Sequence, residues 1–239
     1  MKKSIVSFAV LISLISFVFF SCKSETEKTV GEKKENITTN NAPKENTSSK
    51  DKVDTKEVKL TSEEQKKMNI FFSNFSEVGL MPFESGKIAD EELINFGVLH
   101  NYKNNLSKFE KVDNLNSKIK EEHISASIKK YFGRNFSGHK STGEFKYKNG
   151  YYFIPQADGE AFTFSQVDKM NDIGGDKFTA YVNVYSAGSG WSGDVHASPK
   201  KWGTGEGNPE LTGKFKATVL KTNGPNGESV YTLIDYIKQ

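Results

Sequence analysis

The segment 178-FTAYVNVY-185 decides the predicted fold, because its apolar and polar residues alternate. One face carries Phe178, Ala180, Val182 and Val184, and the other carries Thr179, Tyr181, Asn183 and Tyr185. A period of two residues is typical of a β-strand with one face on a core. Residues 178–185 therefore predict a strand of a half-buried sheet.

Turn signals on both sides of this strand predict antiparallel neighbours. Asn149-Gly150 is a strong signal for a two-residue hairpin, which would pair Tyr147 with Tyr152 and place Phe145 opposite Ile154. The other predicted strands and turns are a strand from Phe162, a turn at 171–176, a strand at 211–220, a turn at 223–227 and a strand at 230–237. The pattern predicts about five antiparallel strands.

Helical signals precede the strands. Thr61-Ser62-Glu63-Glu64 is a capping box, in which Thr61 caps the helix and Glu64 bonds back. One apolar helical face then follows, with Met68, Phe71, Phe72 and Phe75. A second helix is expected from Asp90, with apolar residues on most of its surface, and a third over 123–132, ended by Gly133.

Helices followed by strands predict an α+β fold in which N-terminal helices pack on a twisted antiparallel sheet of about five strands. This element order is similar to that of NTF2-like and cystatin-like domains. Such folds host many functions, so the resemblance implies an architecture and leaves the activity open.

Composition argues against several classes of function. Residues 61–239 carry no net charge, and Arg134 is the single arginine of the chain. Nucleic-acid binding needs clustered positive charge, so we expect no nucleic-acid partner. One cysteine and scattered histidines match no metal or cofactor motif, and we expect no metal, no cofactor and no catalytic residues.

The N-terminus has the layout of an export signal. Two lysines precede an apolar run over 5–20, and Ser21-Cys22 is followed directly by charged residues. This arrangement resembles the lipobox of bacterial lipoproteins, although Phe19 and Phe20 depart from the usual pattern. The resemblance implies a signal peptide over 1–21, covalent diacylglycerol and fatty acyl groups (such as palmitate) on Cys22, and a membrane-anchored protein of the cell envelope, outside the cytoplasm.

Residues 23–60 contain no aromatic residue and few apolar ones. Such a segment cannot bury enough apolar surface to offset its conformational entropy. We therefore expect residues 22–60 to form a lipidated cysteine with a disordered polar tether, and residues 61–239 to form a single domain.

The segment between the strands that end near Ala187 and begin near Leu211 is unusual for a connection. It contains both tryptophans, Trp191 and Trp202, together with Asp194 and His196 and many glycines. Long loops of this kind in a compact domain are usually functional or disordered. Three interpretations stay open: the tryptophans cap the sheet, the loop binds a protein or carbohydrate ligand, or Asp194 and His196 act as a catalytic pair.

These observations favour a non-enzymatic binding or interaction module that is anchored in a membrane. The alternatives are an envelope hydrolase that uses Asp194 and His196, and a structural or assembly lipoprotein. The lipid bilayer is the expected partner of Cys22.

Overall fold

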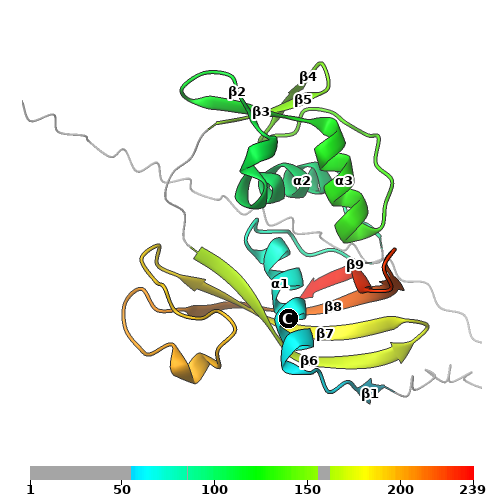
Figure 1. Cartoon of the computed structure of the whole chain (residues 1–239), viewed down its shortest axis with the longest axis vertical. Coiled ribbons are helices and arrows are strands. Elements are labelled where there is room, and N and C mark those ends of the chain that lie inside the picture. The colour runs from blue at the N-terminus through cyan, green and yellow to red at the C-terminus, as the bar shows by residue number, and fades with distance from the viewer. Residues whose placement is uncertain (1–54, 85, 156–161) are drawn as a thin grey trace, which may run out of the picture. The chain divides into compact units, whose positions relative to one another are not determined.

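The computed structural model describes residues 55–84, 86–155 and 162–239. It confirms the predicted α+β class: in this part of the chain three α-helices pack with a five-stranded antiparallel sheet, and a four-stranded antiparallel sheet accompanies them (Figure 1). Its elements are β1 (Lys56–Glu57), α1 (Ser62–Ser76), α2 (Asp90–Asn104), the 3-10 helix η1 (Leu106–Lys108), β2 (Glu110–Lys111), β3 (Asn116–Lys120), α3 (Glu121–Phe132), β4 (Lys146–Lys148), β5 (Tyr151–Pro155), β6 (Phe162–Gly174), β7 (Lys177–Ala187), the 3-10 helix η2 (Pro199–Lys201), β8 (Glu210–Asn223) and β9 (Ser229–Lys238).

The predicted signal peptide and tether and the predicted start of the domain have different outcomes. The signal peptide, Cys22 and most of the tether lie outside them. The sheet, however, begins at Lys56, ahead of the predicted domain start at Thr61, because β1 pairs with β6 and the Val58 amide donates to the Met170 carbonyl at 2.8 Å. The last residues of the predicted tether are therefore part of the fold.

The larger sheet has the strand order β1-β6-β7-β8-β9. The alternation that predicted β7 is confirmed, since Ala180 and Val182 lie in the main core. The turn before β7 is shorter than predicted: β6 continues to Gly174, and only Gly175 and Asp176 form the loop. Both have positive φ, 62° and 58°, as a two-residue hairpin with a type I′ turn requires.

The Asn149-Gly150 hairpin is confirmed, but it does not belong to the larger sheet. Both turn residues have positive φ, and Tyr147 pairs with Tyr152 as predicted. Phe145, in contrast, lies just before β4. The hairpin joins β2 and β3 in the smaller sheet, of order β2-β3-β5-β4. We missed β3 because its five residues contain one strongly apolar side chain, Ile119.

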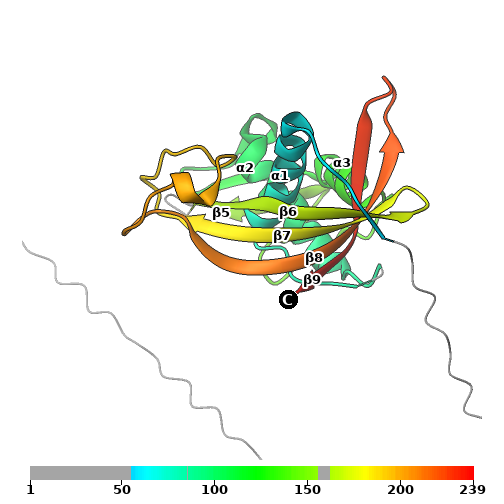
Figure 2. The ribbon, with the colours of Figure 1, turned by 90° about the horizontal axis from the view of Figure 1, so that it is seen from below.

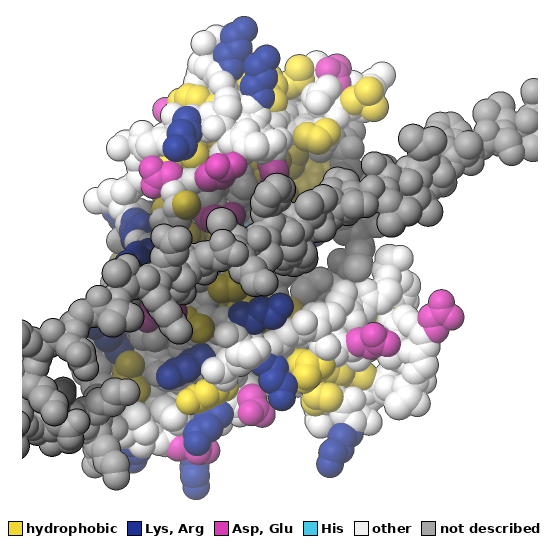
Figure 3. All heavy atoms as spheres, turned by 180° about the vertical axis from the view of Figure 1, so that it is seen from behind, with side chains coloured by type: hydrophobic (Ala, Val, Ile, Leu, Met, Phe, Trp, Pro, Cys, Tyr) yellow, Lys and Arg dark blue, Asp and Glu magenta, His cyan; other side chains and the backbone are white. Residues whose placement is uncertain are grey.

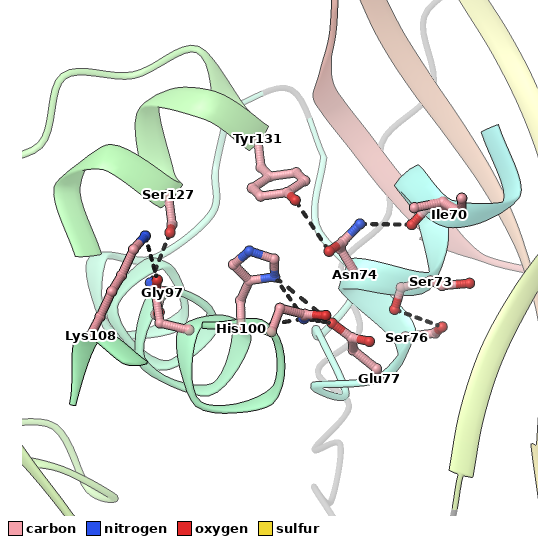
Figure 4. Close-up of polar contacts among 12 residues, drawn as sticks. Ile70, Ser73, Asn74, Ser76, Glu77, Gly97, His100, Lys108, Ser127 and Tyr131 are labelled. Carbon is pink, nitrogen blue, oxygen red and sulfur yellow. Dashed lines mark hydrogen bonds and ion pairs between the residues drawn. The ribbon is translucent and has the colours of Figure 1, made fainter. Parts of the chain in front are cut away.

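Capping signals predicted the start of α1 and the end of α3, whereas α3 begins at Glu121, two residues before the predicted start. Thr61 and Glu64 form both bonds of the capping box, and Gly133 ends α3 with φ 68°. Helix α2 is buried around much of its surface, from Leu93 and Ile94 to His100. Tyr131 of α3 donates a hydrogen bond to Asn74 of α1 at 3.1 Å, where the three helices meet (Figure 4).

A polar stripe on α1 bonds to the backbone of β6. The Ser165 amide donates to the Ser73 hydroxyl at 2.9 Å, and the Val167 amide donates to Asn69 Oδ1 at 2.9 Å. The Gln65 amide group donates to the Val167 carbonyl at 2.7 Å. Gln65, Asn69 and Ser73 recur every four residues, so they lie on one face of the helix. Their side chains take the place of a neighbouring strand along this part of β6.

Candidate functional site

The loop over 188–209, which we call the aromatic loop, packs back on the end of β6 and β7, where Figure 2 shows it in gold. Trp202 is only 8% exposed. Its ring meets Phe164 and Tyr185 edge-on, with centroids 5.3 and 4.9 Å apart, and its Nε1 donates to the Asp194 carbonyl at 2.9 Å. Trp202 thus caps the face of β7 that points away from the main core.

Hydrogen bonds also hold the backbone of the aromatic loop. Gln166 of β6 donates through Nε2 to the carbonyls of Val195 and Ala197, at 2.6 and 2.8 Å. The Gly188 amide donates to the Gly207 carbonyl at 3.0 Å and closes the neck of the loop. These contacts support the interpretation that the loop caps the sheet over the interpretation that it binds a ligand.

Trp191 is partly exposed and retains a small accessible surface. Its ring lies parallel to that of Phe164, at 5.7 Å, and lines a hollow of about 340 Å³ beside Phe162. The same ring covers Gly193, where a Cβ would lie 2.4 Å from the indole, so glycine is needed there.

The catalytic interpretation requires a hydrogen bond between the Asp194 carboxylate and the His196 ring. Asp194 Oδ1 instead accepts the backbone amide of His196 at 2.8 Å. His196 Nδ1 is buried without a hydrogen-bond partner among the described residues. Burial lowers the pKa of His196; Asp194 opposes this effect and Lys66 reinforces it. The two side chains therefore lack the geometry of an oriented general base.

His139 contacts hydroxyl groups through both of its ring nitrogens, and its role is structural. Its Nε2 lies 2.8 Å from Ser125 Oγ and its Nδ1 lies 3.0 Å from Tyr152 Oη. The Ser125 hydroxyl donates to the Phe136 carbonyl at 3.1 Å, so Nε2 is assigned as the donor to Ser125. A serine that gives its proton to a carbonyl is not activated as a nucleophile.

A larger site, which the sequence did not reveal, lies between α1, α3 and β9. This groove has a volume of about 450 Å³. It is lined by Glu64, Lys67, Met68 and Phe71 of α1, Lys130 and Tyr131 of α3, and Glu228, Ser229, Val230 and Tyr231 at the start of β9. The three elements are distant in the sequence, and only the tertiary fold brings them together.

Aromatic rings form much of the groove surface. Phe71 is half-buried, with its centroid 6.2 Å from that of Tyr131 and 6.2 Å from that of Tyr231. Tyr131 is fixed from behind by its bond to Asn74 and by the His100 ring at 4.7 Å (Figure 4). Burial, with the nearby Glu77, raises the pKa of Tyr131 to about 12, so its hydroxyl stays neutral at ordinary pH.

Charged side chains of both signs are found along the groove and elsewhere on the surface. Figure 3 shows lysine and acidic side chains interspersed over one face of the molecule, with apolar side chains between them. Among the described residues no group of three or more His, Cys, Asp or Glu side chains could hold a metal ion. Within the same residues, no helix is long and apolar enough to cross a bilayer.

No protein-family model, curated protein or solved structure matches this chain. The resemblances to lipoproteins and to NTF2-like or cystatin-like domains therefore stay predictions. The functional argument rests on the residues and geometry described above.

Proposed function

We propose that this protein is an exported, lipid-anchored binding module whose ligand site is the groove between α1, α3 and β9. The observation that carries the proposal is the size and lining of the groove. Ligand sites are typically concave, of roughly 300–1,000 Å³, and lined by aromatic and apolar groups with a few polar ones. The groove volume of about 450 Å³ falls within this range, and Phe71, Tyr131 and Tyr231 supply the aromatic surface.

The anchor belongs to the same proposal. The apolar run over 5–20 and the following Cys22 support acylation, and residues 23–54 supply a polar connection to the folded part. A single acyl chain gives only marginal membrane binding, so stable anchoring requires more than one chain on this cysteine.

The groove is tested by filling it. Ser229 is exposed at its rim, and Ser229→Trp would place an indole over the aromatic surface. We expect the full-length chain with Cys22→Ser, which carries no acyl group, to bind the uncharged dye Nile red with a rise in fluorescence. Addition of Ser229→Trp should remove the part of this rise that comes from the groove, and any contribution of residues 1–22 should persist.

Ser192→Trp is the matched control, because it adds the same side chain at the hollow beside Trp191. It should leave dye binding unchanged. If Ser192→Trp abolishes binding and Ser229→Trp does not, the ligand site is the aromatic loop and the groove proposal is wrong. Denaturation of each variant with urea verifies that it is folded.

The anchor is tested separately by metabolic labelling with a fatty-acid analogue. The natural chain should be labelled and should sediment with membranes, whereas the Cys22→Ser chain should remain unlabelled. Labelling that persists in Cys22→Ser would refute acylation at this residue.

A further inference from the structure

We infer that the groove takes an amphiphilic anion, that is, a ligand with an apolar body and a carboxylate or similar anionic group. This inference rests on the proposed function and names the ligand class of the same site. It follows from which polar groups at the rim already have partners and which do not.

In each acidic group of the groove, one carboxylate oxygen already accepts from donors of the chain itself. Glu64 Oε2 accepts from the backbone amide and the hydroxyl of Thr61, both at 2.8 Å. Glu228 Oε2 accepts the Asn226 amide at 3.0 Å. Both carboxylates hold local structure, a helix start and a turn, so less of their acceptor capacity remains for a ligand.

The hydrogen-bond donors of the groove, in contrast, are available to a ligand. The Lys130 ammonium lies 4.8 Å from the centroid of the Tyr131 ring and forms no ion pair with a described residue. The Tyr231 hydroxyl makes no hydrogen bond in the described part of the chain, and burial raises its pKa, so it stays a donor. Lys67 pairs with Glu63 at 2.8 Å, but both side chains are exposed, and solvent screening weakens a surface pair of this kind.

The groove lining includes two lysines and two glutamates, so its net charge does not separate an anion from a cation, but the position of Lys130 does. Aromatic walls can bind a quaternary ammonium ligand through their π faces. Here the Lys130 ammonium already lies over Tyr131, and it would repel a second cation at that ring. An anion would instead gain charge-assisted bonds from Lys130 and a bond from Tyr231, while its apolar body lies against Phe71 and Met68.

The test compares three probes with the same ten-carbon chain: decanoate, decanol and decyltrimethylammonium. Each is titrated into the dye complex of the full-length Cys22→Ser chain, below its micelle concentration or, for decanol, below its solubility limit. Any contribution of residues 1–22 is common to all variants. We expect decanoate to displace the dye at the lowest concentration.

Lys130→Gln should weaken the binding of decanoate about tenfold, which is the factor expected for loss of one charge-assisted hydrogen bond. It should leave the binding of decanol unchanged. Lys129→Gln is the matched control, since it removes the same charge from the same helical turn at an exposed position that does not line the groove. Lys129→Gln should leave the affinities for both decanoate and decanol unchanged.

The outcomes separate this inference from the proposal on which it rests. Tightest binding of decyltrimethylammonium, or equal binding of all three probes without an effect of Lys130→Gln, overturns the anion inference but keeps the groove as a binding site. If no probe binds and dye binding does not depend on Ser229, both the inference and the proposed function are wrong.

Discussion

The two sides of the larger sheet differ in how far hydrogen bonds and contacts within the chain cover them. Along β6, hydrogen bonds within the chain pair the polar groups of the strand. The Asn69 side chain of α1 accepts from the Val167 amide, and the Gln166 side chain donates to the carbonyls of Val195 and Ala197 in the aromatic loop. Along β9, residue Tyr236 exchanges two backbone bonds with Phe83, but the groove opens beside the start of the strand. We call these regions the β6 side and the β9 side.

This difference shows which aromatic residues are available to a ligand. Unpaired strand edges and buried polar groups are costly, and on the β6 side the chain supplies its own partners. Trp202 is part of that closure, because its ring and its Nε1 are both occupied by neighbours. On the β9 side the Tyr231 ring lines the groove, and the Lys130 ammonium forms no ion pair with a described residue. Substitutions on the β6 side should therefore affect stability, and those on the β9 side should affect binding.

The largest expected effect is that of Trp202→Ala. Loss of a buried tryptophan removes its contacts with Phe164 and Tyr185 and leaves a cavity, which typically costs about 3–5 kcal/mol. Urea denaturation should show this loss in the free energy of unfolding. Trp191→Ala, at the partly exposed ring in the same loop, should cost clearly less. Equal losses for the two variants would contradict the distinction between a capping and an accessible tryptophan.

Asn69→Ala should have the next largest effect. Its side chain is 2% exposed and accepts the Val167 amide, which would remain buried without an acceptor at a cost of about 1–3 kcal/mol. Amide hydrogen exchange should accelerate at Val167 and remain slow at Val182 in the neighbouring strand. Lys66→Ala, at an exposed position of the same helix, should stay within about 0.5 kcal/mol of the natural chain. Unchanged exchange at Val167 would show that the polar stripe of α1 does not support β6.

Lys130→Gln should change stability by at most about 1 kcal/mol, because it removes an exposed cation–π contact with Tyr131 and no ion pair with a described residue. On the β9 side the expected signature is thus a change in ligand affinity with little change in the free energy of unfolding. A loss above about 1 kcal/mol on urea denaturation would mean that this lysine supports the fold, and the contrast between the two sides would fail.

Local signals in the sequence predicted local structure well. The capping box at Thr61, the Asn149-Gly150 turn and the stop at Gly133 depend on neighbours within a few residues. The strand at 178–185 also followed from its alternation alone. The assignment of the hairpin to a second sheet did not follow, because it depends on β3, whose short sequence carries almost no apolar pattern.

The candidate sites show the same limit. The composition of the aromatic loop identified Trp191 and Trp202 as unusual, but whether they cap or bind depends on Phe164 and Tyr185 beneath them. The groove left one trace in the sequence, the width of the apolar face of α1, where Phe71 lies beside the core residues Met68 and Phe72. Its other walls come from α3 and β9, and no pattern within either element indicates that they meet.

The smallest predicted effect concerns the pH dependence of the β6 side. Burial lowers the pKa of His196 in the folded state, so the unfolded chain binds more protons between that pKa and the ordinary value of about 6.5. Stability should therefore rise with pH, and this contribution should be lost as the pH falls below about 6.5. Since the side chain is only partly buried, we expect a few tenths of a kcal/mol. Urea denaturation at pH 7.5 and 5.5 should show a slightly larger acid loss for the natural chain than for His196→Gln. His139, whose pKa burial also lowers, contributes equally to both chains and cancels in the difference. A larger acid loss in His196→Gln would mean that protonated His196 gains a partner in the folded state, and this prediction would be wrong.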